Sequence, residues 1–231
     1  MSDLKLLSGG AAHGLVHALT PRFEGETGYG IDGTFDAVGA IAAKLRAGAP
    51  ADLLILTSAL IETLTREGFV AGGSAADVGT VHTAIAVRAG DPVPSIGDAI
   101  GLRAALLDAD AIYFPDPKQA TAGIHFAKVM RDLGVWDEVE PRLRTFPNGS
   151  TAMRELAAAT GERSIGCTQV TEILNTPGVT LAATLPHDYE LATVYTAAVC
   201  ARAASPSEAR RLVALLTGAG ARDARERAGF V

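Results

Sequence analysis

The stretch that decides the fold is Ala47-Gly-Ala-Pro-Ala-Asp-Leu-Leu-Ile-Leu56. A helix that we expect to begin near Phe35 ends at Gly48, and Pro50 blocks its continuation. Asp52 is followed by a fully apolar run, which is typical of a strand buried on both faces of a parallel sheet. A helix that leads into a buried strand in this way indicates an α/β fold.

The same alternation of short apolar strands and helical patterns extends over most of the chain. We expect strands at residues 4–7, 53–56, 81–87, 111–114, 142–146, 164–167, 180–184 and 191–199. We expect the later helices at residues 121–133, 150–159 and 206–216, and an amphipathic helix over the tail 219–231. The pattern predicts mostly parallel sheets with helices on both faces, and no long linker is visible.

The overall composition describes a compact, acidic protein. The chain has 231 residues, 48% of them hydrophobic, and a formal net charge of -6. This charge argues against a nucleic-acid partner, which needs a dense basic face, but it leaves room for an anionic ligand in a local field of opposite sign. No stretch has the length and apolarity to span a bilayer, so we expect no membrane-spanning segment.

The amino terminus and the cysteines bear on the compartment. Residues 1–7 lead directly into the first expected strand without a basic region, an apolar region or a cleavage site of a signal peptide. We therefore expect a cytoplasmic protein if this start is native, and a periplasmic or extracellular one if a signal peptide was removed. Cys167 and Cys200 are expected to be reduced apolar side chains, and no metal or cofactor is expected.

Three junctions between a strand and a helix share small or hydroxyl residues, at 8–13, 119–123 and 147–151. A helix start has unpaired backbone N–H groups and about half a positive charge. Small residues let a ligand approach these donors closely, so several such junctions make a site for a compact anion without Lys or Arg. Ordinary N-capping by Ser and Thr is the alternative reading of each junction.

Two titratable residues stand beside these junctions. His13 lies in the first turn of its helix, where the helix dipole favours a neutral ring that binds a ligand or accepts a proton. Asp36 precedes the next helix, either as its N-cap or as a general base. His17 is one turn after His13, but no third metal ligand accompanies the pair. Gln169, after the strand at 164–167, offers an amide donor.

Four short segments suggest a family: Ala47–Leu53, Asp116–Gly123, Leu133–Asp137 and Ala228–Phe230. Together they resemble the substrate-binding proteins of ABC transporters for molybdate, which have the type II periplasmic-binding-protein fold. The resemblance implies two lobes, each a mostly parallel sheet flanked by helices, formed by residues 1–82 with 188–231 and by residues 83–187. It also implies a ligand cleft between the lobes.

The resemblance implies ligand contacts from both lobes. The residues at the implied positions are Ser8, Gly10, Ala11, His13, Val38, Gly39, Thr121, Ala122, Ser150 and Gln169. The family holds a tetrahedral oxyanion with two serines and a tyrosine, whose positions fall near Ala11, Gly39 and Gln169. Those three side chains are therefore replaced here.

Three functions follow as alternatives. The first is a solute-binding protein that holds a small anion or carboxylate, with an ABC transporter permease as its partner if it is exported. The second is an enzyme on the same scaffold that isomerises a small carboxylic acid, as the similar aconitate isomerases do, with His13 and Asp36 as catalytic residues. The third is a ligand sensor, although no DNA-binding helix-turn-helix accompanies the chain.

Overall fold

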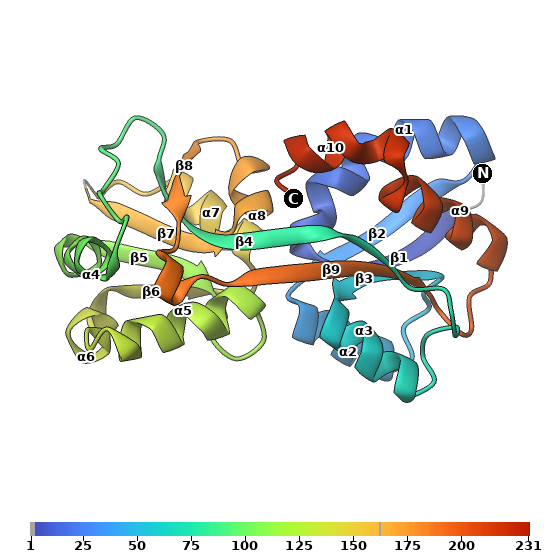
Figure 1. Ribbon diagram of the computed structural model, residues 1–231, viewed down its shortest axis with the longest axis horizontal. Helices are drawn as coiled ribbons and strands as arrows, with labels where there is room; N and C mark the ends of the chain where they lie inside the picture. Colours follow the sequence, from blue (N-terminus) through green and yellow to red (C-terminus); the bar gives the residue numbers. More distant parts are fainter. Residues whose placement is uncertain (1–2, 162) are drawn as a thin grey trace. The chain divides into compact units, whose positions relative to one another are not determined.

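The computed structural model describes residues 3–161 and 163–231, which form two compact units. Unit 1 comprises Met1–Val81 and Thr193–Val231, and unit 2 comprises His82–Ala192. The chain changes unit twice, within strand β4 (Ala76–Arg88) and at the start of strand β9 (Ala192–Val199). In Figure 1 the chain passes from blue to cyan through unit 1, then through unit 2, and returns to unit 1 in orange and red.

Unit 1 is built on a sheet in which β2 (Gly30–Asp36), β1 (Asp3–Gly9), β3 (Leu53–Thr57) and β9 lie in this order. β1 is parallel to both β2 and β3, whereas β9 is antiparallel to β3. The carboxyl ends of β1, β2 and β3 therefore lie at one edge of the sheet, which we call the carboxyl edge of unit 1.

Some of the helices of unit 1 bury apolar faces on this sheet. The helices are α1 (His13–Thr27), α2 (Val38–Arg46), α3 (Ser58–Arg66), α9 (Pro206–Thr217) and α10 (Arg222–Arg227), with 3-10 turns at Gly10–Ala12 and Ala219–Ala221. Ile41 of α2 and Ile61 of α3 pack with Leu54 and Leu56 in one buried cluster. The apolar run after Asp52 is thus buried, as the sequence predicts.

Unit 2 repeats the arrangement with β5 (Ala111–Pro115), β6 (Leu143–Phe146), β7 (Ser164–Gln169) and β8 (Val179–Thr184). β5 is parallel to β6 and β7, and β4 is antiparallel to β7 and β8. The carboxyl ends of β5, β6 and β7 form the carboxyl edge of unit 2.

The helices of unit 2 cover both faces of its sheet (Figure 1). They are α4 (Ala99–Asp108), α5 (Thr121–Asp132), α6 (Trp136–Val139), α7 (Gly149–Ala157) and α8 (Val170–Leu174), with 3-10 turns at Glu140–Arg142 and His187–Tyr189. One face packs Ile85 and Cys167 against Phe126 of α5. The other packs Ala84 against Met153 of α7 and Ile173 of α8. This two-sided cover confirms the predicted α/β fold.

The predicted start of the second helix is wrong. The second helix begins at Val38 rather than near Phe35, because Gly30–Asp36 forms β2, paired with β1 over seven residues. β2 lies at the edge of the sheet, where a strand is less buried than in the centre and needs no continuous apolar run. The sequence Gly-Ile-Asp-Gly-Thr-Phe-Asp therefore gives no strand signal. The N-cap of the helix is Ala37, and not Asp36.

The tail does not form one helix as predicted. α10 ends at Arg227, and Gly229 follows with a positive φ of 92°. The chain then extends so that Phe230 is buried and the Val231 backbone pairs with Thr80, with N–O distances of 2.7 and 2.9 Å. Burial of the last aromatic side chain replaces further helical turns.

The third junction also differs, since its helix begins at Gly149 and is capped by Asn148.

Candidate functional site

The junctions that the sequence singles out lie at the two carboxyl edges. In unit 1 Gly9 at the end of β1 is paired with Asp36 at the end of β2. A 3-10 turn and α1 follow Gly9, and α2 follows Asp36, so the two helix starts are neighbours. A Cβ atom on Gly9 would lie 2.9 Å from Val38 Cγ1 and 3.1 Å from Tyr195 Cε1. Glycine is therefore required where β1 passes between these two side chains.

The titratable residues of this edge have defined neighbours. The exposed ring of His13 packs edge-on against Phe35, with centroids 4.7 Å apart, and its centroid lies 6.4 Å from that of His17. Asp36 Oδ1 accepts a hydrogen bond from the Ala37 backbone N–H at 2.9 Å, and Asp36 Oδ2 lies 3.3 Å from Lys44 Nζ. The carboxylate of Asp36 is thus paired within unit 1.

Several predicted residues of unit 1 offer backbone rather than side-chain groups. Ser8 is fully buried, and its hydroxyl donates to the Gly9 carbonyl at 2.9 Å. Ala11 is also buried, and Gly10, Val38 and Gly39 have no polar side-chain atom. The edge of unit 1 can therefore bind an anion through N–H groups and His13, but offers no free serine hydroxyl at these positions.

In unit 2 the turn between β5 and α5 is fixed from within. Asp116 Oδ1 accepts hydrogen bonds from the backbone N–H groups of Lys118 and Gln119, at 2.6 and 3.1 Å. A Cβ atom on Gly123 would lie 2.2 Å from the Pro115 carbonyl oxygen and 2.4 Å from that of Asp116. Glycine in the first turn of α5 therefore lets the helix start pack tightly on the end of β5, next to Thr121 and Ala122.

The start of α7 already holds an internal carboxylate. Glu172 is buried, and its carboxyl group accepts from the Thr168 hydroxyl at 2.5 Å, from the backbone and hydroxyl of Ser150, and from the backbone of Gln169. Burial raises the pKa of Glu172, although these hydrogen bonds oppose the shift. Because Ser150 donates to Glu172, a ligand would have to compete for the donors predicted there. The sequence reading missed Glu172, and its spacing of four from Thr168 was the available signal.

Gln169 differs from the other predicted residues because its side chain is buried without a partner. It is 2% exposed, and neither Nε2 nor Oε1 has a hydrogen-bond partner within residues 3–161 and 163–231. It lies at the carboxyl end of β7, on the edge from which α5 and α7 begin. An amide of this kind is a ready donor and acceptor for a ligand.

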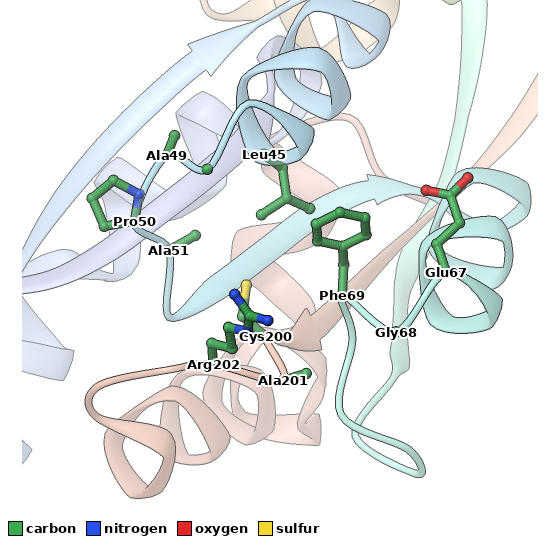
Figure 2. A pocket seen from close by; sticks show the side chains of 11 residues that line it. Leu45, Ala49, Pro50, Ala51, Glu67, Gly68, Phe69, Cys200, Ala201 and Arg202 are labelled. Atoms are coloured by element: carbon green, nitrogen blue, oxygen red, sulfur yellow. The ribbon is translucent and has the colours of Figure 1, made fainter.

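Two cavities lie away from these edges. One, of about 390 Å³, is in unit 1 and is lined by residues that include Leu45, Pro50, Phe69, Cys200 and Arg202 (Figure 2). Its lining comes from the turns that precede β3 and follow α3, and from the end of β9, so it opens at the amino end of β3. The second, of about 240 Å³, lies in unit 2 beside Asp91 and Ser164, before β7. No predicted site residue lines either cavity.

The structure thus sorts the predicted residues into two groups. Ser8, Gly10, Ala11, His13, Asp36, Val38 and Gly39 gather at the carboxyl edge of unit 1, and Thr121, Ala122, Ser150 and Gln169 at that of unit 2. In α/β sheets ligands bind beyond the carboxyl ends of the strands. The fold and these edges define the class: an α/β protein whose predicted site residues gather at the carboxyl ends of its parallel strands.

Comparison with known proteins agrees with this class. The chain belongs to the bacterial extracellular solute-binding protein family, whose model matches residues 4–231. Among residues 3–161 and 163–231, no helix combines the length and the apolarity that crossing a membrane requires.

Individual relatives differ in what they bind or convert. An aconitate isomerase from a Pseudomonas species is 25% identical over the whole chain and 88% of its own length. The molybdate-binding protein ModA of Escherichia coli (strain K12) is 26% identical over 82% of this chain and 75% of its own. The periplasmic molybdate-binding protein of Azotobacter vinelandii has the same fold, with a TM-score of 0.81, 19% identity and 99% and 98% of the two chains covered.

Proposed function

We propose that this protein binds a small carboxylate, with the carboxyl edge of each unit supplying part of the site. This agrees with the contacts from both groups of predicted residues that the resemblance to molybdate-binding proteins implies for the ligand. Backbone N–H groups at the starts of α1, α2 and α5 bind its carboxylate oxygens, and His13 and Gln169 add side-chain contacts. Ser150 acts through Glu172, which it holds in place.

The observation that carries the proposal is that two helices, α2 and α5, begin without a side chain that caps their first-turn N–H groups. The N-caps of α2 and α5 are Ala37 and Ala120, and within the described residues neither makes a side-chain cap. By contrast, Asp98 and Asn148 accept first-turn N–H groups of α4 and α7, at 2.8 and 2.9 Å. Uncapped N–H groups beside small residues attract an anion through both hydrogen bonds and the helix dipole.

The missing hydroxyl groups favour a carboxylate over a molybdate-type oxyanion. Ala11 and Gly39 lie where the resemblance expects the two serines, and the nearby Ser8 hydroxyl is bonded to the Gly9 carbonyl. A tetrahedral oxyanion then loses two side-chain donors. The relative that matches the whole chain is described as acting on aconitate, a carboxylic acid, which supports the same choice.

The proposal is tested by placing a negative charge at the start of α5. Thr121→Asp puts a carboxylate at the first helical position, where it favours the helix but repels a bound anion. Ser207→Asp is the matched control, because α9 also has 12 residues. Since β9 is antiparallel to β3, α9 follows β9 at the sheet edge opposite the carboxyl edge of unit 1. Thermal shifts are measured with citrate, both aconitate isomers, molybdate, tungstate and sulfate, since a ligand that binds only the folded state raises the melting temperature.

We expect at least one carboxylate to stabilise the wild-type protein and Ser207→Asp equally, and to bind Thr121→Asp about tenfold less tightly in a titration. Stabilisation by molybdate or tungstate alone would contradict the choice of a carboxylate. Equal binding by Thr121→Asp would contradict the role of α5.

A second candidate function is isomerisation of a small carboxylic acid. His13 at the start of α1 favours it, because a neutral imidazole there can take a proton from the carbon beside a ligand carboxylate and return it to another carbon. Incubation with trans-aconitate, followed by proton NMR, tests this function. Turnover that is lost in His13→Ala would establish an enzyme, and unchanged spectra over hours would leave binding alone.

We also propose that the protein works outside the cytoplasmic membrane and passes its ligand to an ABC transporter permease. Membership of the extracellular solute-binding family supports both points. Fractionation of the native host and ligand uptake by a deletion strain test them. A protein confined to the cytoplasm, with uptake unchanged by its deletion, would refute this part and would favour an intracellular enzyme or sensor.

A further inference from the structure

A small group of buried polar side chains in unit 2 has no partner of its own. Gln169 and Thr83 lie directly opposite each other on the antiparallel pair β7 and β4. They are 2% and 1% exposed, and Thr171, two residues after Gln169, is 3% exposed. None of their side-chain polar atoms (Gln169 Nε2 and Oε1, Thr83 Oγ1, Thr171 Oγ1) has a hydrogen-bond partner among the described residues. We call Gln169, Thr83 and Thr171 the polar group.

The position of the polar group is as informative as its composition. Residues directly opposite on neighbouring strands point to the same face, so Gln169 and Thr83 share a face with Cys167 and Ile85. That face is the apolar core closed by Phe126 of α5. An unpaired buried polar group destabilises the folded protein, and an apolar side chain would avoid this cost. Two such residues facing each other at the edge where α5 begins call for an external partner.

We infer that the polar group selects a carboxylic acid that also carries a hydroxyl group. The inference rests on the proposed function and names the ligand class of that site. The amide Nε2 donates two hydrogen bonds, which carboxylate oxygens accept. The amide Oε1 only accepts, so a ligand made entirely of acceptors leaves it unpaired. A hydroxyl group next to the ligand carboxylate donates to Gln169 Oε1 and accepts from the Thr83 hydroxyl. Both unpaired side chains, one on β7 and one on β4, then have a hydrogen-bond partner.

An ammonium group is a poorer partner than a hydroxyl at this place. A buried cation needs a carboxylate beside it. The buried carboxylate of this region, Glu172, already accepts hydrogen bonds from Thr168 and Ser150 on the α7 side of the sheet. The polar group itself is neutral, and it therefore matches a neutral hydroxyl.

Matched ligand pairs test the inference. Citrate and tricarballylate differ only in one hydroxyl group, as do malate and succinate. We expect calorimetric titration of the wild-type protein to give at least about tenfold tighter binding of the hydroxyl-bearing member of one pair, because its loss leaves a buried acceptor unpaired. In Gln169→Leu and in Thr83→Val the two members should bind within about threefold of each other.

The same variants separate this role from a structural one. Without ligand, Gln169→Leu should melt no lower than the wild-type protein, because it removes an unpaired buried amide. A lower melting temperature for both variants, with discrimination retained, would show that internal contacts or water satisfy the polar group. Equal affinity of the wild-type protein for both members of each pair overturns the inference and leaves the proposed function standing. Failure of every acid to bind overturns both.

Discussion

Replacing Asp52 tests how the decisive stretch Ala47–Leu56 holds unit 1 together. The side chain is 3% exposed, and each of its oxygens accepts one backbone hydrogen bond. Oδ2 accepts from the Lys5 N–H of β1, and Oδ1 from the Ser205 N–H at the start of α9, both at 2.8 Å. One carboxylate thus joins two segments of the chain that are far apart in the sequence.

The expected loss follows from these two bonds. A hydrogen bond to a charged group contributes about 1.5–3 kcal/mol. Asp52→Asn keeps one acceptor and turns an NH2 group toward the other N–H, so we expect a loss of about 2 kcal/mol. For a chain of this length that corresponds to a fall in melting temperature of roughly 4–8 °C. Asp52→Ala removes both acceptors and should lower the free energy of unfolding by about 3–4 kcal/mol. The loss stays near the lower end of the range for two such bonds, because the N–H groups of Lys5 and Ser205 keep some access to water.

The assay is urea unfolding followed by circular dichroism, with calorimetry for the melting temperature. Asp98→Asn is the control, because Asp98 is an exposed N-cap of α4 and asparagine caps a helix about as well as aspartate. We expect the control to change the free energy of unfolding by less than about 0.5 kcal/mol. If Asp52→Asn is as stable as the control, then this carboxylate does not join the two segments as described.

Three other predictions concern single residues. Burial raises the pKa of Glu172 from 4.5, so its contribution to stability is fully present below pH 4.5 and is lost as the pH rises through the raised pKa. In a pH series of melting temperatures, Glu172→Gln should therefore lose less stability over this range than the wild-type protein. A difference between the two proteins that does not change with pH would contradict the raised pKa. Burial raises the pKa of Cys200 to about 12 and that of Cys167 well above 9.0, so neither should react with a disulfide reagent at pH 8 until urea is added; rapid labelling of the folded protein would disprove this burial. Gly123→Ala should lower the melting temperature and weaken carboxylate binding, because its Cβ atom would meet two backbone carbonyl oxygens; an unchanged variant would show that the start of α5 is not tightly packed.

The sequence predicts those parts of the fold that have a strong apolar signal. The run after Asp52 forms the buried strand β3, and residues 121–133 match α5 to within one residue. β2 was missed because an edge strand with two glycines and two aspartates has no such signal. The end of the tail helix is not predicted because it depends on residues distant in the sequence: Phe230 packs against the Tyr195 ring, and the Val231 backbone pairs with Thr80.

The candidate site was predictable in its place but not in its hydrogen bonding. Parallel strands bring junctions that are distant in the sequence to one edge, so the strand pattern alone is enough to group Gly10 with Gly39. The partner of Ser150 could not be predicted in this way, because Glu172 reaches it from another element. That Gln169 is buried and unpaired likewise depends on packing around β7, to which local sequence gives no guide.

The central claim is that the backbone N–H groups of helix starts bind the negatively charged ligand. The most direct test is a crystal structure of the protein with the carboxylate that binds it most tightly. We predict carboxylate oxygens within about 3 Å of first-turn N–H groups of α2 and α5, near Gly39 and Ala122. A ligand bound by Arg202 in the cavity beside Phe69, or by other cationic side chains, would contradict the account.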